Sequence, residues 1–180
     1  AAQVNETMAA LGLKDSYLYG GYLVSTGAGP PIPLEVERQP GFEGKYTTAW
    51  DLAQLHRGLH LAAEGGGPLV NELGGSFTPA DARFLLYTLA HSADRGKLDR
   101  FMGPEVVVPH KAGWVSDARH DSGIVYSPEG TFVVSVMTWN AYGAGASSDV
   151  LAGRVAEVAL RRFRAADSSS DGLETLSLHL

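Results

Sequence analysis

The stretch that decides the fold runs from Arg119 to Trp139 and reads RHDSGIVYSPEGTFVVSVMTW. Within it, Ser127-Pro128-Glu129-Gly130 is a turn signal between two apolar runs, so the stretch predicts a β-hairpin with strands over 119–126 and 131–139. Both alternating sets of side chains on the second strand are largely apolar. Strands of this kind are covered on both faces, so we expect helices against both faces of the sheet.

Helix signals lie on either side of this hairpin. Apolar spacing predicts a helix from Val4 to Leu11 that stops at Gly12, and Thr48 and Thr78 each precede an acid by three residues, as helix N-caps do. A last helix follows a cap at Ser147 or Ser148. The buried faces predicted for the last two helices are Phe84, Leu85, Thr88 and Leu89, and then Val150, Leu151, Val155, Val158, Ala159 and Phe163.

The order of helices, antiparallel sheet and closing helix predicts an α+β fold, with helices flanking an antiparallel β-sheet. The chain has 180 residues, enough for one domain with a sizeable core, which we place at 1–166. Residues 167–180 are predicted to form a flexible tail. The segment 20–44 is rich in Gly and Pro, so we expect a long loop there.

Composition excludes several classes of function. The formal net charge is −6, whereas a nucleic-acid binder needs a basic surface, so no nucleic-acid partner is expected. The absence of cysteine excludes a disulfide scaffold, thiolate catalysis and cysteine-based zinc sites. No apolar run approaches the roughly 20 residues of a membrane-spanning helix, so no membrane span is expected.

Three weak motifs have ordinary structural explanations. The Gly-Lys pairs are followed by Tyr46 and Leu98, not by the Ser or Thr of a phosphate-binding loop. The Gly-rich stretch 143–148 fits a turn and helix cap better than a dinucleotide loop. His56 and His60 lie four residues apart on a helix, but Arg57 stands where a zinc protease has Glu, so a solvated helix face is favoured over a metal site.

The stretch Val108-Pro109-His110-Lys111-Ala112-Gly113-Trp114 can carry acyl-transfer chemistry. Lysine supplies positive potential near a nucleophile and a substrate carboxylate, and a small residue followed by Gly lets a substrate backbone lie along a strand edge. The N–H group after the Gly, that of Trp114, can bind an oxyanion. From the residues alone, a lysine that protects an exposed edge strand from pairing is the favoured explanation.

The same stretch resembles the Lys-Ser/Thr-Gly motif of the serine β-lactamases and penicillin-binding proteins. The resemblance extends from about Val4 to Phe163. The segment 11–18 is similar to the helix end that leads into the Ω-loop of class A enzymes, and 46–55 is similar to the helix after that loop. The segments 110–114 and 120–126 are similar to the two strands that follow.

The departures from this family indicate that the chain corresponds to its C-terminal part. The nucleophile motif Ser-x-x-Lys and the Ser-Asp-Asn triplet are absent, and both belong upstream in the family. Ala112 replaces the usual Ser or Thr. Segment 20–44 lacks the Glu-x-x-Leu-Asn pattern of the deacylating base, and its acids, Glu35, Glu37 and Glu43, are interpreted as solvated loop charges.

The resemblance implies a serine hydrolase that acts on β-lactams or related amide and peptide substrates through an acyl-enzyme. It implies that Lys111 supplies electrostatics and Trp114 an oxyanion-binding N–H, while Ala112 and Gly113 shape the substrate-binding edge. His110 lies beside them in the substrate-binding set, and with Asp121 it orients neighbouring strands more than it acts directly. No metal or organic cofactor is implied.

Partners and location follow from the same resemblance. The chain alone is predicted to be inactive, and the N-terminal part is expected on a separate chain of the same protein, or else an apolar face is left exposed. The family implies an extracytoplasmic location, periplasmic or secreted. Two alternatives remain open: a catalytically inactive binding module of this fold, which Ala112 favours, and a D-alanyl-D-alanine peptidase.

Overall fold

The computed structural model describes residues 2–18 and 45–177. The predicted loop over 20–44, with its three acids, lies outside the described residues. In chain order, the elements are α1 (Ala2–Ala10), β1 (Tyr17–Leu18), β2 (Lys45–Tyr46), α2 (Ala49–Ala63), α3 (Pro68–Leu73), the 3₁₀ turn η1 (Gly74–Ser76), α4 (Pro79–Ala90), β3 (His110–Trp114), β4 (Ala118–Ser127), β5 (Gly130–Trp139) and α5 (Ala146–Ser177).

The predicted helix starts at Thr48 and Thr78 are confirmed. The Thr48 hydroxyl accepts a hydrogen bond from the Asp51 amide at 3.1 Å, which caps α2. At α4, the Thr78 hydroxyl accepts from the Asp81 amide at 3.3 Å, and the Asp81 carboxylate accepts from the Thr78 amide at 2.9 Å. This reciprocal capping box satisfies two backbone donors that the helix itself leaves unpaired.

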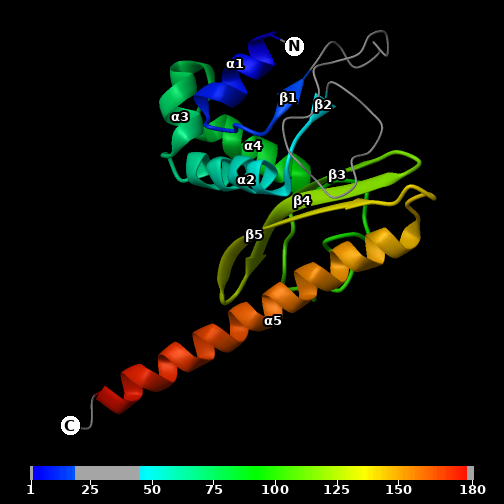
Figure 1. Ribbon diagram of the computed structural model, residues 1–180. Helices are drawn as coiled ribbons and strands as arrows, with labels where there is room; N and C mark the ends of the chain where they lie inside the picture. Colours follow the sequence, from blue (N-terminus) through cyan, green and yellow to red (C-terminus); the bar gives the residue numbers. More distant parts are fainter. Residues whose placement is uncertain (1, 19–44, 178–180) are drawn as a thin grey trace.

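The larger sheet is antiparallel, in the order β3-β4-β5 (Figure 1). The predicted hairpin is confirmed, since β4 and β5 pair along their whole length and Ser127 lies opposite Gly130 at the turn. On the other side of β4, Lys111 lies opposite Ser122. No described strand pairs with the outer edge of β3 or of β5.

Helices cover both faces of this sheet, as predicted, and the α+β fold class is confirmed. Figure 1 shows α2 on one face and α5 on the other. The core between α5 and the sheet consists of Leu98, Val106, Val108, Val125, Val134, Val136, Ala152, Ala156 and Leu160. A second core lies among α2, α3 and α4 and consists of Leu59, Ala62, Ala63, Leu69 and Ala82.

The predicted buried face of α4 is wrong for three of its four residues, and Leu89 is the member that packs, partly buried, against the core. Phe84 is 72% exposed and Leu85 is 41% exposed, and Thr88 also lies at the surface. The helix instead turns Ala82 into the core, where its small side chain is fully buried and lets α4 approach α2 closely. Apolar residues surround most of this helix, so the sequence does not determine which side faces inward.

The predicted face of α5 is also wrong in part, because small residues occupy the buried side. Ala152 and Ala156 lie in the core, and a Cβ added at Gly153 would lie 2.7 Å from the Lys97 carbonyl oxygen. The helix therefore packs closely by its smallest residues. Larger members of the predicted face form an exposed stripe at helical spacing: Leu151 (52%), Val155 (41%) and Val158 (46%).

The helix α5 extends to Ser177, past the start of the tail predicted at 167. No proline interrupts the sequence from Ala146 to Ser177, so the backbone hydrogen bonding of the helix continues. Its last turns project beyond the sheet (Figure 1). Among the described residues, no helix combines the length and the apolar character that crossing a bilayer requires.

Candidate active site

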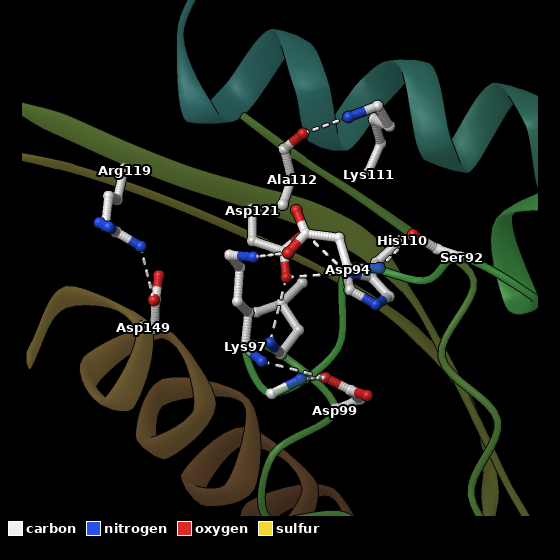
Figure 2. Close-up of polar contacts among 12 residues, drawn as sticks. Ser92, Asp94, Lys97, Asp99, His110, Lys111, Ala112, Arg119, Asp121 and Asp149 are labelled. Atoms are coloured by element: carbon white, nitrogen blue, oxygen red, sulfur yellow. Dashed lines mark hydrogen bonds and ion pairs between the residues drawn. The ribbon is translucent and has the colours of Figure 1, made fainter. Parts of the chain in front are cut away.

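Lys111 lies on the edge strand β3, and its side chain leaves the sheet on the α2 side (Figure 2). Successive residues of a strand point to opposite faces. His110 and Ala112 accordingly point to the other side and are buried, at 1% and 3% exposure, whereas Lys111 is exposed. The Nζ atom of Lys111 donates a hydrogen bond to the carbonyl oxygen of Ala112, so the ammonium group lies against the strand backbone.

The backbone of β3 offers hydrogen-bonding groups along its outer edge. The Ile124 amide donates to the Pro109 carbonyl at 3.0 Å, and the Val115 amide donates to the Ala118 carbonyl at 2.9 Å. In an antiparallel ladder these bonds alternate, so odd-numbered residues of this strand bond to β4 and even-numbered residues point their N–H and C=O groups outward. The amide of Trp114 belongs to this outward set.

The end of the strand is open on both faces, since Gly113 points to the α2 side with Lys111 and Trp114 points to the α5 side with His110 and Ala112. A Cβ added at Gly113 would meet nothing within 4 Å, and the Trp114 side chain is 65% exposed. The guanidinium carbon of Arg119 lies 5.6 Å from the Trp114 ring centroid, and Arg119 forms an ion pair with Asp149 of α5 at 2.8 Å (Figure 2). The structure thus brings Lys111, Gly113 and Trp114 together along a strand edge that no described strand pairs with.

His110 and Asp121 form a buried ion pair or hydrogen-bonded pair between β3 and β4. The His110 Nδ1 atom lies 2.9 Å from both carboxylate oxygens of Asp121. A carboxylate can only accept, so Nδ1 is protonated and is the hydrogen-bond donor. The Asp121 Oδ2 atom also accepts from the Leu98 amide at 3.1 Å. His110 therefore faces away from the exposed edge that carries Lys111.

The expectation of a solvated face at His56 and His60 is wrong, because α2 packs these residues against the sheet. His56 is 7% exposed, and its Nδ1 atom lies 2.9 Å from the Leu52 carbonyl and 3.1 Å from the Ser122 hydroxyl. The carbonyl can only accept, so Nδ1 is protonated and cannot act as a base toward Ser122. His60 Nδ1 lies 3.1 Å from the Tyr126 hydroxyl.

Burial lowers the pKa of His56, because a charged imidazolium is poorly solvated there. The hydrogen bond to Leu52 and the charge of Asp121 act in the opposite direction, while His110 lowers it further. Ser122, beside it, is 2% exposed and so is unsuited to attack a substrate. In the part of the chain that the structure describes, no three His, Asp or Glu side chains are grouped as metal ligands.

A polar network that the sequence did not indicate lies in the turn after α4 (Figure 2). Lys97 is 6% exposed and forms an ion pair with Asp94. Burial alone would raise the pKa of Asp99, but hydrogen bonds from the Lys97 and Gly96 amides, together with nearby His110 and Arg95, lower it. Charged residues are frequent in 94–99, but such a cluster usually lies at the surface, so the sequence gives no sign of this burial.

Sequence comparison supports the family that the strand motif indicated. The model of the beta-lactamase enzyme family matches residues 1–163. No curated protein is similar enough in sequence to count as a match.

Solved structures with the same fold include β-lactamases and a penicillin-binding protein. A β-lactamase from Sphaerobacter thermophilus is 21% identical, with a TM-score of 0.65 over 90% of this chain and 53% of its own. The protein PBP-A is 18% identical, with a TM-score of 0.66 over 91% of this chain and 51% of its own. A class A β-lactamase representative from Bacteroides cellulosilyticus is 20% identical, with a TM-score of 0.64 over 87% and 52%.

The chain spans about half the length of these solved structures. At this level of identity, the likeness establishes the fold, and the partial coverage agrees with a partial domain of helices and antiparallel sheet. The family model matches residues 1–163, and a match over most of the chain establishes family membership in addition to the fold. The strand edge at Lys111 thus lies in a chain that belongs to the beta-lactamase enzyme family.

Proposed function

We propose that this chain forms the Lys111 strand edge of a serine hydrolase that acts on β-lactams or related amide and peptide substrates. The observation that carries the proposal is the joint placement of Lys111, an open Gly113 and an outward-facing Trp114 amide on one edge, where the described residues provide no pairing strand. Membership of the beta-lactamase enzyme family supports a hydrolase of this general type. No metal or organic cofactor is part of the proposal.

The proposed roles follow from the chemistry of each group. The ammonium group of Lys111 attracts a substrate carboxylate and favours a deprotonated hydroxyl nearby. The Trp114 amide donates to the carbonyl oxygen as it becomes an oxyanion. Ala112 has no hydroxyl for the carboxylate, and Gly113 leaves space for an extended ligand beside the strand. The His110 side chain points to the opposite face, so in this proposal it holds the strand in position and does not contact the substrate.

The reaction proceeds through an acyl-enzyme in this proposal. A serine hydroxyl oxygen attacks the amide carbon, the C–N bond breaks, and the nitrogen leaves with the hydroxyl proton. Water then cleaves the ester to release the acid and regenerate the serine. The sequence of this chain contains no Ser-x-x-Lys, so we propose that the nucleophile lies on a segment outside residues 1–180, upstream in the same protein or on a separate chain.

Exposed apolar surface supports such a covering segment. The α5 stripe of Leu151, Val155 and Val158 and the α4 residues Phe84 and Tyr87 are all more than 40% exposed. The outer edge of β5 has no strand partner among the described residues. The α4 residues lie on the α2 side of the sheet and the stripe on the opposite side. We propose that the nucleophile-bearing segment, or failing it another copy of the chain, covers the α5 stripe and the β5 edge. The proposed location is extracytoplasmic, where the substrates of this family lie.

A catalytically inactive binding module is the second candidate. Ala112 favours it, because the hydroxyl that usually holds the substrate carboxylate is missing. A D-alanyl-D-alanine peptidase shares the fold and the proposed edge, so it differs only in substrate. Turnover of a chromogenic cephalosporin, compared with turnover of a D-Ala-D-Ala peptide by the native protein, separates the hydrolases from each other and from a binder that turns over neither.

The proposed role of Lys111 is tested by comparing Lys111→Ala with Lys14→Ala in the native protein that contains the nucleophile segment. Both lysines are exposed, but only Lys111 lies on the β3 edge. We expect Lys111→Ala to lower the rate of acylation by a fluorescent penicillin by about 10²-fold or more, as loss of a preorganised charge does, and Lys14→Ala to leave it unchanged. Equal rates for wild type and Lys111→Ala would contradict the proposal.

A further inference from the structure

We propose that His110 and Asp121 are positioning residues that fix the register of β3 on β4 and thereby place Lys111 on the α2 face. This inference rests on the proposed function of Lys111 and extends it to the opposite face of the sheet. It begins with the location of the pair: the two side chains are 1% and 2% exposed and lie directly beneath the strand that carries the lysine.

The Asp121 carboxylate connects three separate segments of the chain by hydrogen bonds. It belongs to β4, it accepts from the imidazole of His110 on β3, and it accepts from the Leu98 amide in the turn after α4. Figure 2 shows this carboxylate between the edge strand and that turn. One side chain thus links β3 to two neighbours that are themselves packed in the core.

Close contact at Gly123 holds the two strands together at the same point. A Cβ added there would lie 2.6 Å from the Pro109 carbonyl oxygen and 2.6 Å from the Cβ atom of His110. Gly123 lies directly opposite His110 in the ladder. The backbone of β3 therefore approaches β4 more closely than any other residue type at position 123 would allow.

Lys111 lies between two residues that this arrangement anchors, His110 and the buried Ala112. A slip of one residue in a strand moves every side chain to the other face, so it would turn Lys111 toward α5 and His110 toward α2. Apolar side chains tolerate such a slip better than a hydrogen-bonded pair, whose geometry is met in one register only. Buried polar pairs contribute little net stability, and register is the use best attested for them.

The test removes the link without leaving a buried charge. In the double variant His110→Leu/Asp121→Asn, the Asn side-chain oxygen still accepts from the Leu98 amide, but the bond to residue 110 is lost. His110→Asn is the matched conservative variant, because its amide N–H can still donate to Asp121. Cross-strand NMR contacts between residues 111 and 122 report the register in the chain of residues 1–180, without any need for activity.

We expect one set of contacts between Lys111 and Ser122 in wild type and in His110→Asn. We expect weakened or multiple sets in the double variant, with the chain still folded. In the native protein with its nucleophile segment, the acylation rate of the double variant should be about 10- to 100-fold below that of wild type, in line with a misplaced catalytic group. The rate of His110→Asn should stay close to that of wild type.

Two results would overturn the positioning role: a single wild-type register in a folded double variant, or an unchanged acylation rate in a protein whose Lys111→Ala variant is slow. If the double variant does not fold, His110→Asn provides the test. A changed register or slow acylation in His110→Asn would also overturn the positioning role. An unchanged rate in Lys111→Ala is a different outcome, since it removes the proposed function, while the NMR contacts still decide whether the pair sets the register.

Discussion

Both carboxylate oxygens of Asp121 lie 2.9 Å from Nδ1 of His110, on the face of the sheet opposite Lys111. From His110 to Ala112, the edge strand therefore has a buried side and an exposed side with different tasks. The exposed face carries the groups that we propose to meet the substrate. The buried face holds the strand in place, and the stability of the fold at this point can be tested residue by residue.

Replacement of Gly123 by Ala should destabilise the protein, because the new methyl group would lie 2.6 Å from the Pro109 carbonyl oxygen, which is backbone and cannot move aside. We expect a loss of about 1–3 kcal/mol of unfolding free energy, as for other overpacked sites, measured by urea denaturation. Gly145→Ala is the control, since a Cβ there meets nothing within 4 Å. Equal stability of the two variants would contradict the close approach of β3 and β4.

Gly153→Ala reverses the usual effect of this substitution in a helix. Alanine normally favours a helix over glycine by up to about 1 kcal/mol. At this position the added Cβ would lie 2.7 Å from the Lys97 carbonyl oxygen and 3.0 Å from the Phe101 ring, so we expect a lower thermal midpoint. An increased midpoint would show that α5 is not packed against the 97–101 turn as described.

The pH dependence of stability should include a contribution from His56. Burial lowers the pKa of this imidazole below its ordinary value of 6.5, so the unfolded state binds a proton that the folded state resists. The contribution is fully present above pH 6.5 and is lost as the pH falls through the lower, folded pKa. We expect the urea midpoint to fall as the pH decreases from 6.5 toward the folded pKa.

The matched variant for this prediction is His56→Asn, which keeps an N–H donor for the Leu52 carbonyl but does not titrate. Its urea midpoint should fall less steeply with decreasing pH than that of wild type. Part of the slope should remain, because burial also lowers the pKa of His120. The same slope in both proteins would mean that His56 does not resist protonation in the folded state.

The exposed stripe of α5 predicts that the purified chain of residues 1–180 associates when no other polypeptide covers it. Sedimentation velocity should show concentration-dependent association that Leu151→Lys/Val155→Lys weakens, because both side chains are exposed and apolar. Arg161→Lys, an exposed change on the same helix that preserves charge, is the control. A stable, folded monomer at all concentrations would count against a missing covering segment.

The sequence predicted those parts of the fold that depend on local chemistry. The turn at Pro128 and the caps at Thr48 and Thr78 are local signals, and each appears where it was expected. The hydrophobic spacing of α4 and α5 was correct as a helix signal but not as a guide to orientation. In both helices the side that packs most closely on its neighbour carries small residues, such as Ala82 in α4 and Gly153 in α5. A prediction that places the largest apolar residues inside misses this side.

The candidate site also has a part that local sequence predicts and a part that depends on packing. The motif at Lys111 could be recognised from consecutive residues, because a strand places its neighbours along one edge. The contact between His56 and Ser122 spans 66 residues of sequence, and that between Asp121 and Leu98 spans 23. Such contacts depend on how elements pack, so a single sequence shows polar residues there but not their burial.

The most direct test of the central claim is to map the site of penicillin acylation in the native protein. The chain should be isolated from its source cells with an antibody, together with any segment or partner attached to it, then treated with a fluorescent penicillin and analysed by peptide mass spectrometry. The account predicts an adduct on the serine of a Ser-x-x-Lys motif outside residues 1–180, and none within them. An adduct on any residue of this chain, or no adduct on material that contains such a motif, would contradict it.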